Sequence, residues 1–465
     1  MTGRKTVAFV SLGLALVLLA AGVGYLSRIA PSGTGYKAMT ACTALFVSGR
    51  SIAGLEREEF AGLHPILDYV SVSVDANEGR VSAEMLGMGA RTAMYREGLG
   101  CTLTDYGDDL PPVPDGLGDP LSTTTGDWSE PDLSAVPNDR LNAAMQQAFA
   151  EPEIESKFNT RALLVYHDGM LVGERYADGI SEETALPGYS LTKTILGALI
   201  GIAYADDPGF LKKRADLKAW RNLEDDDPRR EITISDLLHM TTATHWSEAT
   251  GDPLSPILKM TYHSSDMAAY AAEQESEGEP GSKFQYNSGS SLILSRLLLD
   301  RLGNDTEAYL RFPREKLFAP TGMASAIIAA DARGTLNGGF GASATARDWL
   351  RFGLLYLNNG KSGNQQVLPE GWIEASKVTQ PASAERGYGL HVWVNQPFEK
   401  DGSVQLPRPR LPIDTLLMNG QFGQLVAVVP SRKVVIVRLG QSNNWDFSND
   451  PDQLIVSILS ALPEG

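Results

Sequence analysis

The sequence predicts an α+β sandwich, in which an antiparallel sheet is flanked by helices and an all-helical subdomain is inserted between two groups of strands. Residues 161–177 have the apolar runs and the central Asp-Gly turn of a β-hairpin. Residues 195–205 contain no charged side chain, so as a helix they would be apolar on every face and would lie inside a core. Two apolar strands within residues 425–439 and a last helix at residues 452–462 complete the order. Strands at both ends of a mostly helical stretch are typical of a sheet covered by helices.

The composition is that of an ordinary globular protein with an acidic balance. The chain has 465 residues, enough for one large domain and a smaller one. It carries 57 acidic and 40 basic residues, a net charge of -17. Because phosphate binding needs clustered positive charge, this balance argues against nucleic acid as a partner. The six histidines form no His-x-x-x-His pattern, and neither a metal nor an organic cofactor is expected.

The amino-terminal segment, residues 1–28, is expected to be a membrane anchor or a signal sequence. Residues 7–26 are twenty residues without a charge, which is long enough to cross a bilayer as a helix. Arg4 and Lys5 precede them and predict a cytoplasmic amino end. A cleaved signal peptide usually has a shorter apolar core and a clear small-x-small site, so an anchor is favoured. Either segment would place the rest of the chain in the cell envelope, in the periplasm or outside the cell.

Residues 36–109 are expected to form a small α+β accessory module, followed by a proline-rich linker at residues 110–137. Both cysteines of the chain, Cys42 and Cys101, lie in this module. In an oxidising compartment they suggest a disulfide, worth about 4 kcal/mol on the chain-entropy model. Two unrelated buried thiols are the alternative. Since the module contains no catalytic grouping, catalysis is expected from residues 138–465.

A reactive pair is predicted where the apolar helix begins. Ser190 and Lys193 are three residues apart, hence on one helical face, and follow a Pro-Gly turn. Burial lowers the pKa of a lysine, and a neutral amine beside a hydroxyl is a general base beside a nucleophile. This is the chemistry of a Ser-x-x-Lys hydrolase. One chance occurrence in a chain of this length is the alternative, but this is the single Ser-x-x-Lys in the sequence.

Further motifs follow this pair in a fixed order. They are Phe-Gln-Tyr-Asn-Ser-Gly at residues 284–289, Thr-Ala-Arg-Asp at residues 345–348 and Asn-Gly-Gln-Phe-Gly-Gln at residues 419–424. With them the chain resembles the serine β-lactamase and penicillin-binding-protein superfamily, and within it the 6-aminohexanoate-dimer hydrolase and esterase branch. The likeness covers residues 163–439 and implies a β-lactamase/transpeptidase-like fold.

The resemblance implies a role for each matching side chain. Ser190 would be the acylated nucleophile, Lys193 its base, and Tyr286 a second proton-transfer residue, with Ser288 in the third position of the tyrosine motif. A phenol beside an ammonium can ionise far below its usual pKa of about 10, which is the physical case for a catalytic tyrosine. A buried aromatic ring at the start of a helix is the alternative for Tyr286. Trp246 lies in a stretch that borders the substrate entrance in relatives, as does Glu248.

The last motif departs from the pattern of the superfamily. Cephalosporinases and penicillin-binding proteins have Lys-Thr-Gly here and many esterases have His-x-Gly, whereas this chain has Asn419, Gly420 and Gln421 without a cation. The loss of that cation favours a neutral amide or ester over a substrate with a carboxylate. Gly420 would let the substrate approach the strand, and the backbone N–H groups of Gln421 and Ser190 would form the oxyanion hole.

Three functions are therefore open. The first is an exported serine hydrolase that cleaves a small amide or ester through an acyl-enzyme. The second is a β-lactamase or D-Ala-D-Ala carboxypeptidase, and the third a non-catalytic sensor of cell-wall fragments with the same fold. The reactive side chains favour an enzyme, and the missing cation favours the first function.

Overall fold

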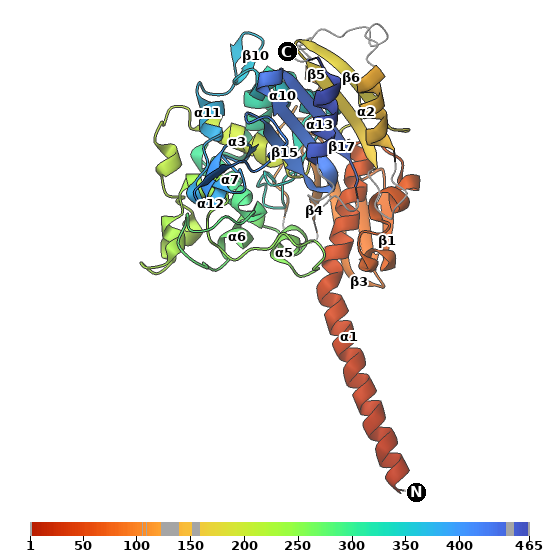
Figure 1. Cartoon of the computed structure of the whole chain (residues 1–465). Helices are drawn as coiled ribbons and strands as arrows, with labels where there is room; N and C mark the ends of the chain where they lie inside the picture. Colours follow the sequence, from red (N-terminus) through yellow and green to blue (C-terminus); the bar gives the residue numbers. More distant parts are fainter. Residues whose placement is uncertain are drawn as a thin grey trace.

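The protein consists of a long amino-terminal helix, a small module at the upper end of this helix, and a large body of sheet and helices (Figure 1). The computed structural model describes residues 2–104, 106–107, 109–121, 139–150, 159–442 and 451–463, with side chains from residue 11 onward. Residues 122–137, most of the expected linker, lie outside the described residues.

Six antiparallel strands form the central sheet of the large body, in the order β12-β15-β16-β17-β5-β6. The hairpin and the late strand pair predicted from the sequence are β5–β6 and β16–β17, and they lie side by side through β17 and β5. The prediction of an α+β fold with an antiparallel sheet is confirmed. The strands are β5 (Thr160–His167), β6 (Met170–Tyr176), β12 (Trp393–Val394), β15 (Leu416–Gly420), β16 (Gln424–Val429) and β17 (Val434–Gly440).

Helices cover both faces of this sheet. One face packs against α2 and α13, and the other against α3 and α10. Neighbouring residues of β17 show the two faces, since Ile436 belongs to the first core and Val437 to the second. Because both faces are buried, the strands are continuously apolar instead of alternating. The helices are α2 (Asp139–Phe149), α3 (Leu191–Ala203), α10 (Ala346–Leu357) and α13 (Pro451–Ala461).

A group of helices follows α3 in the sequence, where the helical insertion was predicted. These are α4 (Ile234–His239), α5 (Pro256–His263), α6 (Met267–Ala272), α7 (Ser288–Arg301), α8 (Thr306–Pro313) and α9 (Ala319–Thr321). A small second sheet has the strand order β7-β9-β8, and its strand β7 comes just before α3 in the sequence. The remaining short elements are β7 (Leu186–Pro187), β8 (Ile327–Ile328), β9 (Ala342–Ala344), β10 (Lys361–Ser362), β11 (Gln365–Gln366), α11 (Trp372–Ser376), α12 (Pro381–Ala384), β13 (Phe398–Lys400) and β14 (Ser403–Gln405).

The small module packs a four-stranded meander against the upper part of α1 and has an apolar core of its own. Cys42, at the end of α1, forms a disulfide with Cys101 of β4. This bond fixes the carboxyl end of the helix to the last strand of the meander. The elements are α1 (Thr2–Cys42), β1 (Val70–Asp75), β2 (Arg80–Met85), β3 (Met88–Arg96) and β4 (Gly100–Leu103).

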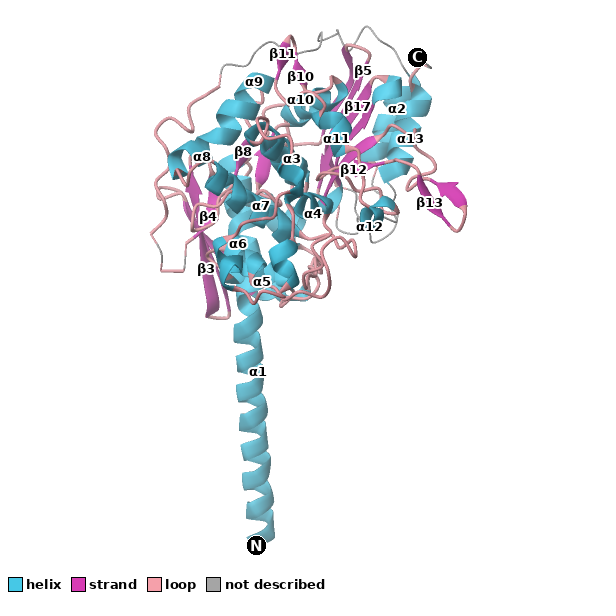
Figure 2. Ribbon diagram, turned by 90° about the vertical axis from the view of Figure 1, so that its left-hand side faces the viewer, coloured by secondary structure: helices cyan, strands magenta, loops and turns pink. Residues whose placement is uncertain are grey.

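The first helix changes character along its length. By length and composition α1 is apolar enough to cross a membrane. Residues 11–28 are exposed, whereas residues 29–42 are mostly buried against the meander and α5. Figures 1 and 2 both show the exposed part projecting from the body. Exposed apolar side chains over several turns indicate a lipid-facing or protein-facing surface, not the core helix of a globular domain.

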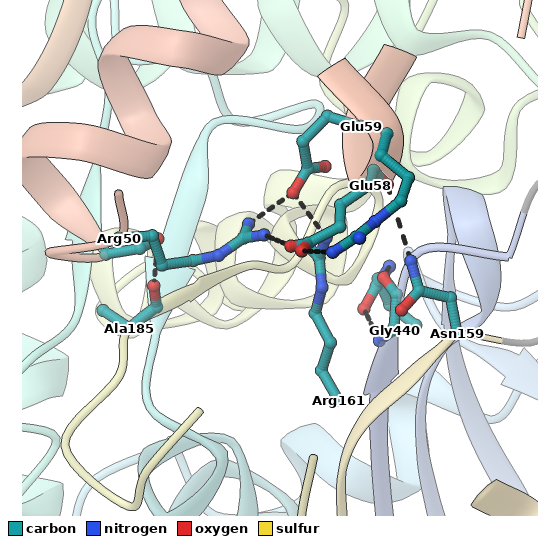
Figure 3. Close-up of polar contacts among 10 residues, drawn as sticks. Arg50, Glu58, Glu59, Asn159, Arg161, Ala185 and Gly440 are labelled. Carbon is teal, nitrogen blue, oxygen red and sulfur yellow. Dashed lines mark hydrogen bonds and ion pairs between the residues drawn. The ribbon is translucent and has the colours of Figure 1, made fainter. Parts of the chain in front are cut away.

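A buried group of ion pairs joins the module to the large body (Figure 3). The carboxylate of Glu59 is 3% exposed and pairs with both Arg50 of the module and Arg161 of β5. Arg50 also pairs with Glu58, at 2.6 Å between Nη2 and Oε2. Since Arg161 belongs to the central sheet, Glu59 holds two parts of the chain together through charges that have little access to water.

Replacing Glu59 by alanine is expected to destabilise the full-length protein by about 3–5 kcal/mol, because two buried guanidinium groups would lose their shared partner. The midpoint of urea denaturation measures this effect. The matched control is Glu385→Ala, which removes an exposed ion pair with Lys400 and should change the midpoint little. Equal midpoints for the two variants would contradict the stabilising role of Glu59.

Candidate active site

Ser190 lies at the start of α3, on a tight turn that follows β7. It is the N-cap residue of α3, and its side chain makes no capping hydrogen bond to the helix. Tyr189 before it has a φ of 47°, in the left-handed region. A Cβ atom on Gly188 would lie 2.2 Å from the Trp349 ring, so only glycine fits there. Ser190 is half-buried, and its hydroxyl is not used to cap the helix.

Lys193 lies one turn further along α3 and is 1% exposed. Its Nζ is 3.0 Å from Ser190 Oγ, 2.9 Å from Ser288 Oγ and 2.9 Å from the carbonyl oxygen of Gly339. Burial lowers the pKa of Lys193 to about 8, against the opposing effect of the Glu248 charge. A neutral amine has two N–H donors, which suit Gly339 and Ser288, and one lone pair, which is left for the hydroxyl of Ser190.

Tyr286 lies beside this pair. Its ring centroid is 4.8 Å from Lys193 Nζ, and its hydroxyl is hydrogen-bonded to Ser190 and to Tyr388. Burial, with a smaller contribution from the charge of Glu248, raises the pKa of Tyr286 above its ordinary value. The expectation of an easily ionised phenol is therefore wrong, because loss of water outweighs the neighbouring amine. The phenol of Tyr286 is therefore neutral before the reaction, and it can relay a proton only if it accepts one while it donates its own.

Glu248 connects to the pair of Ser190 and Lys193 through Ser288. Its carboxylate accepts hydrogen bonds from Ser288 N at 2.5 Å, Ser288 Oγ at 3.0 Å and the indole Nε1 of Trp246 at 2.7 Å. Trp246 is itself 3% exposed, so its indole N–H holds the carboxylate of Glu248 in a fixed position. The side chains thus form a continuous series of contacts from Glu248 through Ser288 and Lys193 to Ser190.

The carboxyl end of β15 passes close to the turn that carries Ser190. A Cβ atom on Gly420 would lie 2.4 Å from the carbonyl oxygen of Gly188, so the glycine permits this approach. Gln421 is exposed, and Phe422 after it has a φ of 60°. Alternation along β15 puts Gly420 on the face that packs against α3, and Asn419 on the opposite face. Gly420 therefore brings the end of β15 against Gly188, two residues before Ser190.

Two features of the site were not found in the sequence. Tyr286 stacks on Trp393 with centroids 5.7 Å apart, and Tyr388 packs edge-on against both rings. Both partners lie about 100 residues after Tyr286, so no local pattern indicates the contact. The other is the carbonyl of Gly339, because a run of glycines does not indicate which carbonyl oxygen will accept a hydrogen bond from a side chain. Within the described part of the chain, no group of His, Cys, Asp and Glu side chains could hold a metal ion.

If Lys193 is the base for Ser190, the kcat/KM for a nitrophenyl ester should rise with pH along a limb centred near pH 8, because only the neutral amine can accept a proton. Glu248→Gln should move this limb to lower pH, since it removes the charge that raises the pKa of Lys193. Glu374→Gln, at an exposed carboxylate, is the control and should leave the limb unchanged. A limb that stays in place or moves to higher pH in Glu248→Gln would contradict this coupling.

Solved structures of several hydrolases share this fold. A Bacillus anthracis protein assigned as a 6-aminohexanoate-dimer hydrolase is 21% identical, with a TM-score of 0.54 over 76% of this chain and 90% of that one. EstCE1, a hydrolase with promiscuous acyltransferase activity, is 18% identical, with a TM-score of 0.51 over 72% and 98%. A Bacteroides dorei protein assigned as a β-lactamase is 18% identical, with a TM-score of 0.52 over 69% and 98%. A comparison with curated protein sequences finds no match.

A family model adds to these likenesses at the level of sequence. The model named Beta-lactamase matches residues 143–459, which include the helical region and the whole central sheet. With the structural neighbours, this match shows that the chain belongs to the Beta-lactamase family, in the superfamily of serine β-lactamases and penicillin-binding proteins.

Proposed function

We propose that this protein is an exported, membrane-anchored serine hydrolase that cleaves a small amide or ester through an acyl-enzyme on Ser190. The observation that carries the proposal is the buried amine of Lys193, 3.0 Å from Ser190 Oγ and with a lowered pKa. A lysine that is 1% exposed and has no direct carboxylate partner among the described residues is costly for a fold, so a catalytic use explains it best.

Acylation begins when the lone pair of Lys193 takes the proton of Ser190. The Oγ atom attacks the substrate carbonyl, and a tetrahedral intermediate with a negative oxygen forms. The backbone N–H groups of Ser190 and Gln421 are our candidates for its oxyanion hole, because Gly420 brings β15 against the Ser190 turn. Donors of this kind account for about 3 kcal/mol of barrier each.

Release of the leaving group then needs a proton. Lys193, now an ammonium, returns one through the hydroxyl of Tyr286, which passes its own proton to the departing nitrogen or oxygen. Water attacks the acyl group by the reverse sequence, with Lys193 again as base, and the carboxylic acid leaves. Glu248 and Ser288 would hold Lys193 in place and stabilise its charged form during each cycle.

The substrate class follows from what borders Ser190. The strand end at Asn419, Gly420 and Gln421 offers no cation to a carboxylate. The aromatic surface formed by Tyr286 and Trp393, with the buried Tyr388 packed against both rings, suits an uncharged group. A neutral amide or ester fits these surroundings better than a β-lactam or a peptidoglycan terminus, each of which carries a carboxylate.

The anchoring part of the proposal is supported by α1. Its exposed apolar segment follows Arg4 and Lys5, so the amino end would remain in the cytoplasm and the body would lie outside. The disulfide between Cys42 and Cys101 fits an oxidising compartment on that side.

Trapping of the acyl-enzyme tests the proposed chemistry. Incubation with an activated ester, followed by acid quenching and peptide mass spectrometry, should locate one added acyl group on Ser190. The label should disappear in Ser190→Ala and persist in Ser403→Ala, which changes an exposed serine in the hairpin of β13 and β14. Acylation elsewhere would contradict the assignment of Ser190. Stoichiometric labelling by a fluorescent penicillin would instead assign a β-lactam substrate to the same serine.

A further inference from the structure

The level at which α1 leaves the body defines where a membrane surface would lie. Residues 11–28 of α1 are exposed, and Ile29 is the first residue that is buried against the module. Tyr25 and Leu26, at the top of the exposed segment, are 56% and 36% exposed. Tyrosine is enriched at the boundary between lipid and water, so this boundary fits the height of Tyr25 to Arg28.

The hairpin of β2 and β3 reaches down to the same level. A Cβ atom on Gly89 would lie 2.5 Å from the Cβ atom of Ala30, and Thr34 Oγ1 donates a hydrogen bond to Gly89 O at 2.5 Å. At the other end of β3, Tyr95 stacks on Phe46. The strand therefore runs in the same direction as α1, and its tip points toward the exposed segment. Figures 1 and 2 show the lower end of β3 beside α1, where the helix emerges.

Leu86 at this tip is 68% exposed and has a φ of 52°. Met85 pairs with Met88, so Leu86 and Gly87 form a two-residue loop in which both have positive φ. Asparagine and glycine favour such a loop, whereas leucine adopts the conformation at a cost. The exposed side chain and the unfavourable backbone conformation together indicate that Leu86 does not stabilise the hairpin.

A second exposed apolar side chain lies next to Leu86. Val70 pairs with Met85 across the sheet, which places Tyr69, 62% exposed, beside the loop. Asp68 is exposed too and prefers water, which limits how deep this end of the module can enter a bilayer. The chemistry of the surface is thus that of the headgroup region, with one aliphatic and one aromatic side chain.

We propose that Leu86 and Tyr69 form a second membrane contact, which docks the tip of the β2–β3 hairpin into the lipid headgroup region beside α1. This contact rests on the proposed anchoring by α1. One helix alone leaves the body free to tilt with it, whereas a second contact at one side fixes the tilt. The occupant of this surface is the bilayer that already surrounds the exposed part of α1.

Single-cysteine labelling tests the contact in the full-length protein. Both native cysteines are in the disulfide, so an introduced cysteine would be the single free thiol. Leu86→Cys would carry an environment-sensitive fluorophore, in vesicles of phosphatidylethanolamine and phosphatidylglycerol. Its emission should shift to the blue, and lipids with a nitroxide near the headgroup should quench it more strongly than lipids with a nitroxide near the chain end.

Cysteines at two further positions distinguish a failure of the hairpin contact from a failure of the α1 anchor. Leu16→Cys, in the exposed apolar part of α1, should be quenched by the deep nitroxide. Val404→Cys, 71% exposed on β14, should not be quenched, because β14 pairs with β13, which Figure 2 shows well away from α1. Quenching at Leu16 without quenching at Leu86 would overturn the hairpin contact and leave the anchor intact. No quenching at Leu16 would overturn the anchor, and the contact with it.

A stability measurement examines the premise that Leu86 is not needed for folding. Leu86→Asn should leave the melting temperature unchanged or raise it, because asparagine suits a left-handed loop position. A clear fall in the melting temperature would show that the leucine serves the fold, and would overturn the argument for the contact.

Discussion

Ser190→Ala is expected to lower kcat for a nitrophenyl ester by about 10⁴-fold or more, since no acyl-enzyme can form without the hydroxyl. Lys193→Met, which keeps the length of the side chain and removes the base, should cause a loss of similar size. The two side chains touch at 3.0 Å and act in one step. The double variant should therefore be no worse than either single variant, because residues of one catalytic unit are not additive.

The control for Lys193→Met is Lys433→Met, which removes an exposed lysine paired with Asp168 and should keep full activity. Circular dichroism of each variant would show that the body remains folded. If Lys193→Met kept most of its activity, or if the losses in the double variant multiplied, serine and lysine would act independently and the proposed mechanism would be wrong.

Tyr286→Phe is expected to lower kcat by about 10²–10⁴-fold, the range of a lost general acid or base, with little change in KM. The variant removes the hydroxyl that bonds Ser190. The ring that stacks on Trp393 and lies 4.8 Å from Lys193 Nζ would stay. Steady-state kinetics with an ester and with the matching amide measure the effect.

The leaving group makes this test specific. A nitrophenolate departs without protonation, whereas an alkyl alcohol or an amine must be protonated, so Tyr286→Phe should harm the alkyl ester and the amide more. Tyr204→Phe, at the opposite end of α3, is the control and should leave all substrates unaffected. Equal losses for every leaving group would show that Tyr286 orients Ser190 and does not deliver the proton.

The sequence predicts the fold well where the signal is local. The β5–β6 hairpin, the uncharged helix α3 and the strands β16 and β17 are long apolar runs, and their length and turns suffice to assign them. The pairing of β17 with β5 joins segments more than 250 residues apart, and no local pattern indicates it. The spacing of Ser190 and Lys193 is equally local, because one turn of helix fixes it.

The rest of the candidate site depends on contacts between distant segments. The carbonyl of Gly339 reaches Lys193 from a loop, and nothing in a glycine run indicates which carbonyl will be used. Trp393 meets Tyr286 through an edge strand of two residues. The pKa of Tyr286 could not be judged either, because the sequence shows a neighbouring amine but not the depth of burial.

The helix α1 runs unbroken from Thr2 to Cys42, past Pro31 and into the packed module. Because no flexible linker separates the proposed anchor from the body, and because the proposed hairpin contact fixes the tilt, every copy in a membrane would carry Ser190 at one fixed height above the lipid. Molecules that diffuse within that thin layer would meet the serine often, whereas bulky polymers farther out would stay beyond its reach. The helix would thus select substrates by their distance from the membrane, before the residues around Ser190 select them by structure.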